Sequence, residues 1–204
     1  MDADDLLDQL RGAGVGRGDH LALALADDVG LGLATDGRTF QMATPDPADV
    51  VDRIDAAIGP RWVWWDRATA DQIAAAGVPI DRCWDVLTVH RLLRGGWRTS
   101  VPLVWAWIHG LSEETLPHMG QLGLLDAMSD EGDDPEDPQR PDGHLRPEWV
   151  SGGWRTTPER LERWAALAHG AAELQRTHLA GRRTSPSRGV GRKVARTHQN
   201  HVHS

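Results

Sequence analysis

The sequence predicts an α/β fold in which a three-stranded antiparallel meander precedes helices and one further buried strand. Residues 21–26 alternate leucine with alanine, the period-two pattern of a strand. Asp36-Gly37 is a strong hairpin-turn signal between two apolar segments. Residues 62–65 are continuously apolar, as in a strand that is covered on both faces. These observations predict the element order βββ-α-β-α.

Turn and cap residues place the individual elements. Asp27-Asp28 forms the first turn, so the meander continues with a return strand and then a third strand. Asp46 is the expected N-cap of a helix with Pro47 in its first turn. Glycine or proline ends each later helix, and a short extended piece separates two of them. The predicted strands are 21–26, 29–34, 39–42 and 62–65, the extended piece is 78–80, and the predicted helices are 46–58, 68–76, 85–93 and 101–111.

The remaining segments set the predicted domain organisation. Residues 1–18 are expected to be a flexible N-terminus, in which residues 4–10 could form a short helix, leading into a domain over 19–118. Residues 119–156 are rich in acids and prolines and are predicted to be a disordered acidic linker. An amphipathic helix is predicted over 157–179, with Thr157 as N-cap. Residues 180–204 are basic and lack hydrophobic periodicity, which predicts a disordered tail. The apolar stripe expected on the helix consists of Leu161, Trp164, Leu167, Ala168, Ala171 and Leu174.

Charge is distributed unevenly along the chain of 204 residues, whose net charge is −8. Residues 180–204 hold six basic residues and no acids, so residues 1–179 hold 16 basic and 30 acidic residues, a net −14. A body of that charge repels a phosphate backbone unless its basic groups are clustered. The composition therefore argues against tight nucleic-acid binding by residues 1–179.

The sequence predicts a soluble, cytoplasmic protein that has no membrane partner. No run of eighteen apolar residues is present, and the first ten residues are acidic where a signal peptide is basic. Cys83 is the only cysteine, so the chain cannot form an internal disulfide. We interpret this cysteine as a core residue beside Trp84.

Tryptophan and arginine residues provide the one candidate nucleic-acid contact. Three of the ten tryptophans lie in the apolar segment 62–65, which favours a core role over base stacking. Arg91, Arg94, Trp97 and Arg98 form the only basic and aromatic cluster before residue 180. We expect weak DNA contact at this cluster, with added salt-sensitive affinity from the basic tail.

The element order and two sequence segments resemble a known family. These segments are WDVLTVHRLLRGGW at 84–97 and DPQRPDGHLRPEW at 137–149. With the βββ-α-β-α order, they resemble the N-terminal 3′–5′ exonuclease-like region of actinobacterial family-A (DNA polymerase I-type) bifunctional exonuclease/DNA polymerases. The likeness covers roughly residues 20–179. It implies a ribonuclease-H-like fold, a replication or repair context and truncation before the polymerase domain. The resemblance also implies two candidate partners, a polymerase domain or another protein.

The exonuclease chemistry that this resemblance implies requires carboxylates that hold two metal ions about 3.5–4 Å apart. The family places an Asp-x-Glu pair on the first strand, where this chain has alternating leucine and alanine. Thr69 stands where the family has a second acid. Asp85 is interpreted as the N-cap of the helix that follows it. We therefore predict a degenerate, non-catalytic domain with no catalytic residue, metal ligand or cofactor.

Two alternatives remain open at this stage. A working 3′–5′ exonuclease would use Mg²⁺ or Mn²⁺ with the non-standard acids Asp27, Asp28, Asp66 and Asp85. A non-enzymatic module would instead bind other proteins through the acidic segment or the tryptophan-rich helices. Cleavage of labelled DNA separates the first alternative from the degenerate domain, and selective capture of proteins favours the second.

Overall fold

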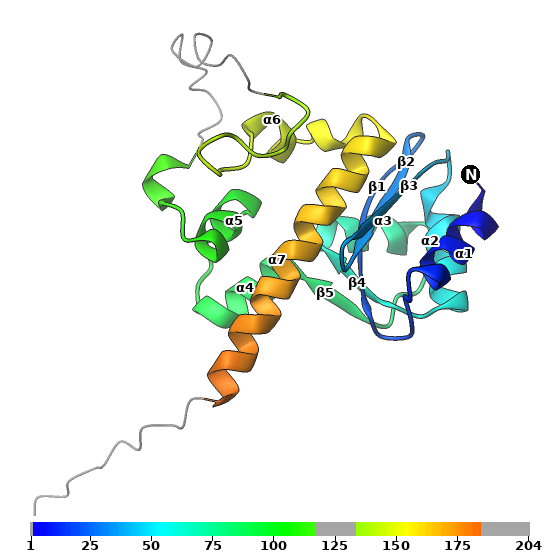
Figure 1. Cartoon of the computed structure of the whole chain (residues 1–204), viewed down its shortest axis with the longest axis horizontal. Coiled ribbons are helices and arrows are strands. Elements are labelled where there is room, and N and C mark those ends of the chain that lie inside the picture. The colour runs from blue at the N-terminus through cyan, green and yellow to red at the C-terminus, as the bar shows by residue number, and fades with distance from the viewer. Residues whose placement is uncertain (1, 117–133, 185–204) are drawn as a thin grey trace, which may run out of the picture.

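The computed structural model describes residues 2–116 and 134–184, which form a mixed five-stranded sheet with helices on both faces (Figure 1). The strand order is β3-β2-β1-β4-β5. The first three strands are antiparallel neighbours, whereas β4 and β5 run parallel to β1. The α/β prediction and the meander are thus confirmed. The strands are β1 (His20–Ala26), β2 (Gly30–Thr35), β3 (Arg38–Ala43), β4 (Arg61–Trp64) and β5 (Cys83–Asp85).

The helices form a layer on each side of the sheet (Figure 1). One face is covered by α1 (Ala3–Gly12), α2 (Pro47–Ala57) and α3 (Arg67–Ala75). The long helix α7 (Pro158–Thr184) crosses the other face. Further elements pack beside α7, namely α4 (Val86–Arg94), α5 (Val101–His109), α6 (Pro147–Val150) and the short 3₁₀ helix η3 (Gly153–Arg155); a second 3₁₀ helix, η1 (Glu113–Thr115), follows α5.

The two faces of the sheet differ in side-chain size. Because strand side chains alternate between faces, the leucines of β1 point toward α1–α3 and its alanines toward α7. The neighbouring strands continue the pattern, with Leu31, Leu33, Trp62 and Trp64 on the first face and Ala34 and Val63 on the second. Small side chains on the second face allow α7 to approach the sheet closely.

Gly32 of β2 marks the closest approach of α7 to the sheet. A Cβ built on Gly32 would lie 2.1 Å from the backbone nitrogen of Glu162 and 2.2 Å from the carbonyl carbon of Leu161. No side chain fits there without displacing the helix backbone. On α7 the facing residues are also small, and Ala165, Ala168, Ala171 and Ala172 are all fully buried. The predicted apolar stripe is confirmed for Leu161, Trp164, Ala168 and Ala171 and wrong for Leu174, which is exposed; Ala165 and Ala172 also lie on the buried face.

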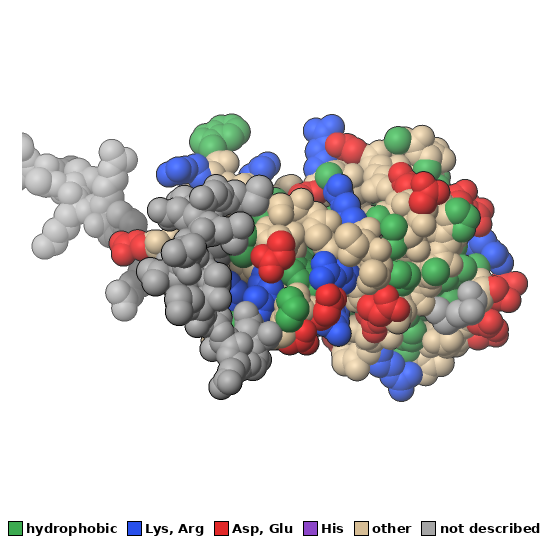
Figure 2. Space-filling model, turned by 90° about the horizontal axis from the view of Figure 1, so that it is seen from above, with side chains coloured by type: hydrophobic (Ala, Val, Ile, Leu, Met, Phe, Trp, Pro, Cys, Tyr) green, Lys and Arg blue, Asp and Glu red, His purple; other side chains and the backbone are tan. Residues whose placement is uncertain are grey.

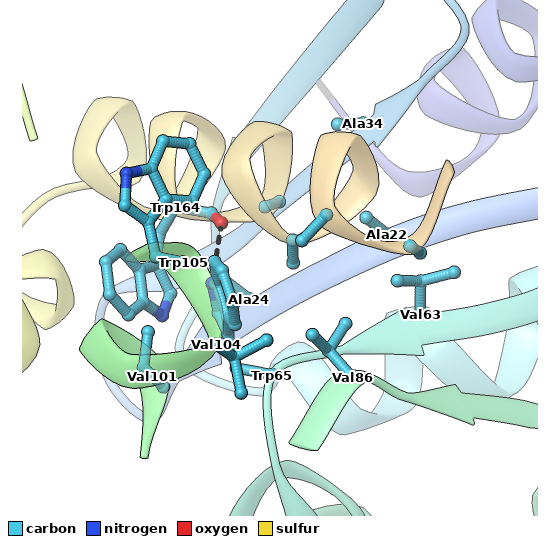
Figure 3. Close-up of a cluster of buried hydrophobic side chains, with 14 of the residues drawn as sticks. Ala22, Ala24, Ala34, Val63, Trp65, Val86, Val101, Val104, Trp105 and Trp164 are labelled. Carbon is cyan, nitrogen blue, oxygen red and sulfur yellow. Dashed lines mark hydrogen bonds between the residues drawn. The ribbon is translucent and has the colours of Figure 1, made fainter. Parts of the chain in front are cut away.

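Tryptophans pack together in this core beside the first turns of α7 (Figure 3). The indole nitrogen of Trp65 donates to the backbone carbonyl of Trp164 at 3.3 Å. The Trp65 ring also contacts the ring of Trp105, with centroids 6.3 Å apart. The predicted core role of Trp62, Trp64 and Trp65 is confirmed, since each is at most 4% exposed.

The flexible N-terminus predicted over 1–18 is ordered over residues 3–12, where α1 confirms the short helix expected at 4–10. Asp2 caps this helix, and a capping box joins Asp2 and Asp5. Leu6 and Leu10 are fully buried against the sheet. The apolar face of this amphipathic helix packs on the sheet, and its burial supplies the free energy that orders the segment.

The prediction of a disordered linker over 119–156 is wrong for residues 134–156; residues 117–133 lie outside the described part. An isolated bridge pairs Gln139 with Leu145, and α6 follows. Trp149 is fully buried, and its indole nitrogen donates to the carbonyl of Pro135 at 3.2 Å. Composition suggested disorder, but burial of Leu145 and Trp149 against the rest of the core provides the apolar area that this segment lacks alone.

Several boundaries also differ from the predictions. The extended piece at 78–80 is not a strand; the fifth strand is β5, paired with β4 through Trp62 and Cys83. Proline at position 79 has no N–H to donate to a ladder, which explains the shift. Cys83 is exposed, not part of the core. The middle of the sheet is β1, with β4 beside it.

The last described element is the C-terminal helix α7. α7 continues to Thr184, past the predicted end at 179, and residues 185–204 of the predicted tail lie outside the described part. Within the described ranges, no helix has the length and apolar character needed to cross a membrane.

Candidate functional site

The four acids named for a working nuclease follow the carboxyl ends of three parallel strands. Asp27 and Asp28 come directly after β1, Asp66 follows β4, and Asp85 is the last residue of β5. Because these strands are neighbours and parallel, their carboxyl ends lie at one edge of the sheet. The fold therefore gathers these residues into one region, which we call the carboxyl edge.

Most of these carboxylates have local structural partners. Asp66 caps α3 and accepts from the Ala68 backbone at 2.8 Å. Asp85 caps α4 and accepts from the Thr88 backbone at 2.7 Å, as its predicted capping role required. Asp27 accepts from the side-chain amide of Gln72 at 2.7 Å. These bonds hold helix starts and a turn, which is the common use of aspartate at such positions.

Asp28 occupies a strained position in the β1–β2 turn. Asp28 is the only described non-glycine residue with positive φ, at 62°. Aspartate tolerates this left-handed conformation better than most residues.

Burial raises the pKa of Asp85, hydrogen bonding from Thr88 opposes that effect, and the negative charge of Asp66 raises the pKa further. Two acids therefore interact at the carboxyl edge.

Two interacting acids do not make a two-metal site. Among residues 2–116 and 134–184, no group of three or more histidine, cysteine, aspartate or glutamate side chains is arranged to hold a metal ion. Two-metal hydrolysis requires several carboxylates to converge on both ions. The carboxyl edge, as described, offers capping aspartates and no such cage.

A small cavity lies beside the carboxyl edge. Its volume is about 140 Å³, and its lining includes Asp66, Thr69 and Gln72. Trp154 of η3 also lines it and stacks on Trp164 at 5.8 Å between centroids, with planes 9° apart. A cavity of this size is below the range of about 300–1,000 Å³ that holds small ligands. Thr69, named from the sequence as the place of an expected acid, thus faces a small cavity beside packed tryptophans.

The predicted basic cluster lies at the end of α4 and in the loop that follows. Arg91 and Arg94 occupy the last turn of α4, and Trp97 is 95% exposed. The guanidinium of Arg94 lies 5.6 Å from the ring centroid of Trp107. Arg98 is exposed as well. All four predicted residues are therefore accessible on one short segment, which we call the α4 edge.

Acidic and basic side chains are intermixed on the face that Figure 2 shows, without a continuous basic surface there. This arrangement agrees with the acidic composition of residues 1–179. A phosphate contact on this face therefore requires a local cluster of basic groups.

Sequence reasoning missed a polar pocket at the opposite edge of the sheet. It lies where β1 and β4 begin, and it contains His20, Arg61, His169, Glu173 and Arg176. Three of these residues recur at positions 169, 173 and 176, which places them on one face of α7. The spacing of these polar residues can be read from the sequence, but the apolar stripe from which the helix was predicted lies on a different face. We call this site the amino-edge pocket.

In comparisons with known proteins, no family model, curated protein or solved structure matches the chain.

Proposed function

We propose that this chain is a ribonuclease-H-like domain, similar to the 3′–5′ exonuclease-like region of family-A DNA polymerases, that does not cleave nucleic acid. Its proposed role is structural, as a platform in DNA replication or repair. DNA contact at the α4 edge is weak, and a polymerase domain or another protein is the expected main partner.

The sheet supports the fold part of this proposal. Three antiparallel strands followed by two parallel ones, in the order β3-β2-β1-β4-β5, agree with the meander and added strand that the resemblance implies. The mixed sheet alone is compatible with other α/β folds, so the resemblance of residues 84–97 and 137–149 contributes the family assignment.

The observation that carries the loss of catalysis is the packing of α7 on β1 and β2. In the family that the chain resembles, the first strand bears an Asp-x-Glu pair. Here Ala22 and Ala24 face α7 in the apolar core, and Leu23 faces the other core. A carboxylate in place of Ala22 would be fully buried among apolar side chains, at a cost of several kcal/mol. At Gly32 the backbone of α7 lies directly against β2, so no side chain fits between helix and strand at that point.

A cleavage assay tests the non-catalytic proposal. The full chain is incubated with 5′-labelled single-stranded DNA and Mn²⁺, beside the variants Asp66→Asn and Asp85→Asn. Asparagine retains helix capping while removing the carboxylate, so both variants keep the fold. The proposal predicts intact DNA with all three proteins. Shortening of the DNA by the wild-type chain that is lost in either variant would establish the alternative nuclease and overturn the proposal.

A binding assay tests the α4 edge. Fluorescence anisotropy of labelled single-stranded DNA should rise weakly with the wild-type chain and less with Arg98→Gln or Trp97→Ala. The three arginines of the α4 edge should contribute about −2 to the slope of log K against log salt for a single strand, at about −0.7 per phosphate, beyond the contribution of the basic tail, and Arg98→Gln should reduce the slope by about 0.7. Arg67→Gln is the matched control, because Arg67 is an exposed arginine on α3 that pairs with Asp71 at 3.1 Å.

Exposed apolar side chains favour the protein-interaction module as a second candidate. Leu92 is 80% and Trp97 is 95% exposed, both on the α4 edge. Large exposed apolar groups beside arginines are typical of protein contacts. Unchanged anisotropy in all DNA titrations, with a protein retained by the wild-type chain and lost with Trp97→Ala, would favour this candidate over DNA contact.

A further inference from the structure

The amino-edge pocket has the size and polarity of a small-molecule site. Its volume is about 420 Å³, within the range of roughly 300–1,000 Å³ of ligand pockets. The loop at 13–19 closes one side, α7 closes another, and Trp84 of β5 forms an aromatic wall. The Trp84 indole is fixed by Gln175, which accepts from it at 2.9 Å and donates to the carbonyl of Val86.

The carboxylates around this pocket are already engaged or lie at its rim. Glu173 accepts from Nδ1 of His20 at 2.7 Å and also pairs with Arg176. Asp19 accepts from the backbone of Gly16 at 2.9 Å. Asp36 is at the rim, with its side chain 88% exposed. The acids therefore orient neighbouring groups or meet solvent.

Two donors lack a hydrogen-bond partner. The guanidinium of Arg61 makes no hydrogen bond or ion pair within the described residues, although it lines the pocket. Nε2 of His169 is buried and without a hydrogen bond; the nearest carboxylate oxygen, on Asp36, is 3.7 Å away. His169 as a whole is only 8% exposed. An unsatisfied buried polar atom is costly, so a ligand that bonds to it gains binding energy.

We propose that the amino-edge pocket binds a small organic monocarboxylate. Arg61 receives the carboxylate through its planar, two-pronged donor group, and His169 adds a second polar contact. The Trp84 wall and the nearby Val15 accept the apolar part of the molecule. Glu173, Asp19 and Asp36 carry three negative charges against the two arginines, which favours a singly charged ligand over phosphate.

Titration with benzoate tests this site, with histidine ring signals followed by NMR. The wild-type chain should show saturable shifts of the His20 and His169 signals, while those of His90 and His109 stay fixed. Arg61→Gln should weaken binding at least about tenfold through the lost charge-assisted bonds. The control Arg67→Gln, which changes an exposed arginine on α3 that is not among the residues lining the pocket, should bind like wild type.

Three outcomes would overturn the proposal. His20 and His169 signals that do not move with benzoate exclude the site without any variant. Equal benzoate affinity in Arg61→Gln and Arg67→Gln excludes Arg61 as the anchor. Saturable binding of inorganic phosphate in preference to benzoate contradicts the singly charged ligand. Should Arg61→Gln fail to fold, Arg61→Lys replaces it, since lysine keeps the charge but lacks the two-pronged donor and should still bind benzoate more weakly.

Discussion

Substitution of Gly32 by alanine should destabilise the protein through the contact between β2 and α7. The added Cβ would stand 2.1 Å from the backbone nitrogen of Glu162. Ordinary contact between such atoms requires about 3.5 Å, so α7 must retreat by about 1.4 Å. No side-chain rotation relieves this clash, because the atoms on the α7 side belong to the backbone.

The cost follows from overpacking and from the contacts that the retreat opens. Forcing an extra methyl group into a packed core typically costs about 1–3 kcal/mol. A gap of about 1 Å also forfeits up to half of each van der Waals contact along the fully buried alanines of α7. We expect a loss of about 2–4 kcal/mol in the free energy of unfolding.

Urea denaturation followed by tryptophan fluorescence measures this loss, because Trp65 and Trp164 report on the same interface. The matched control is Gly170→Ala. Gly170 also lies on α7, but it is exposed, and a Cβ added there would stand in open space. Alanine there should stabilise the helix by up to about 1 kcal/mol. A Gly32→Ala variant within about 0.5 kcal/mol of wild type would refute the close packing of α7 on the sheet.

Three further predictions concern charge and exposure. Asp85→Asn should be at least as stable as wild type at pH 7. Burial raises the folded-state pKa of Asp85 above its ordinary 3.8, so ionisation of this carboxyl costs stability as pH rises through that window. Urea denaturation across pH should therefore show a flatter dependence of the free energy of unfolding in the variant. Burial lowers the pKa of His169, so wild-type stability should fall as pH drops below about 6.5 toward the lowered folded-state pKa, and His169→Gln should lose less over the same pH series. Trp97→Ala should change the free energy of unfolding by no more than about 0.5 kcal/mol, because the side chain is 95% exposed, and a larger loss in urea denaturation would contradict that exposure.

Local patterns in the sequence were enough to predict the elements of the sheet. The leucine–alanine alternation of β1 and the Asp36-Gly37 turn depend on neighbouring residues only, so the meander could be placed directly. Cap residues did the same for α2 and α4, where Asp46 and Asp85 each accept from the first turn. Such short-range chemistry is readable without tertiary information.

Long-range packing explains what the sequence could not predict. Leu145 and Trp149 order an acidic, proline-rich segment only because α7 and α5 provide a surface that lies elsewhere in the chain. The amino-edge pocket joins His20 with Glu173, which are 153 positions apart. Ala165 and Ala172 of α7, which were not predicted to be inward, are buried because small residues such as Gly32 on the sheet let the helix approach closely.

Calorimetric titration of the full chain with Mn²⁺ tests most directly whether the carboxyl edge can act as a two-metal centre. The packing of Ala22 and Ala24 against α7, and the capping roles of Asp66 and Asp85, predict no saturable binding there. The heat should be unaffected by the double substitution Asp66→Asn and Asp85→Asn. Saturable binding of two Mn²⁺ ions per chain that this double substitution abolishes would contradict the proposed loss of nuclease chemistry.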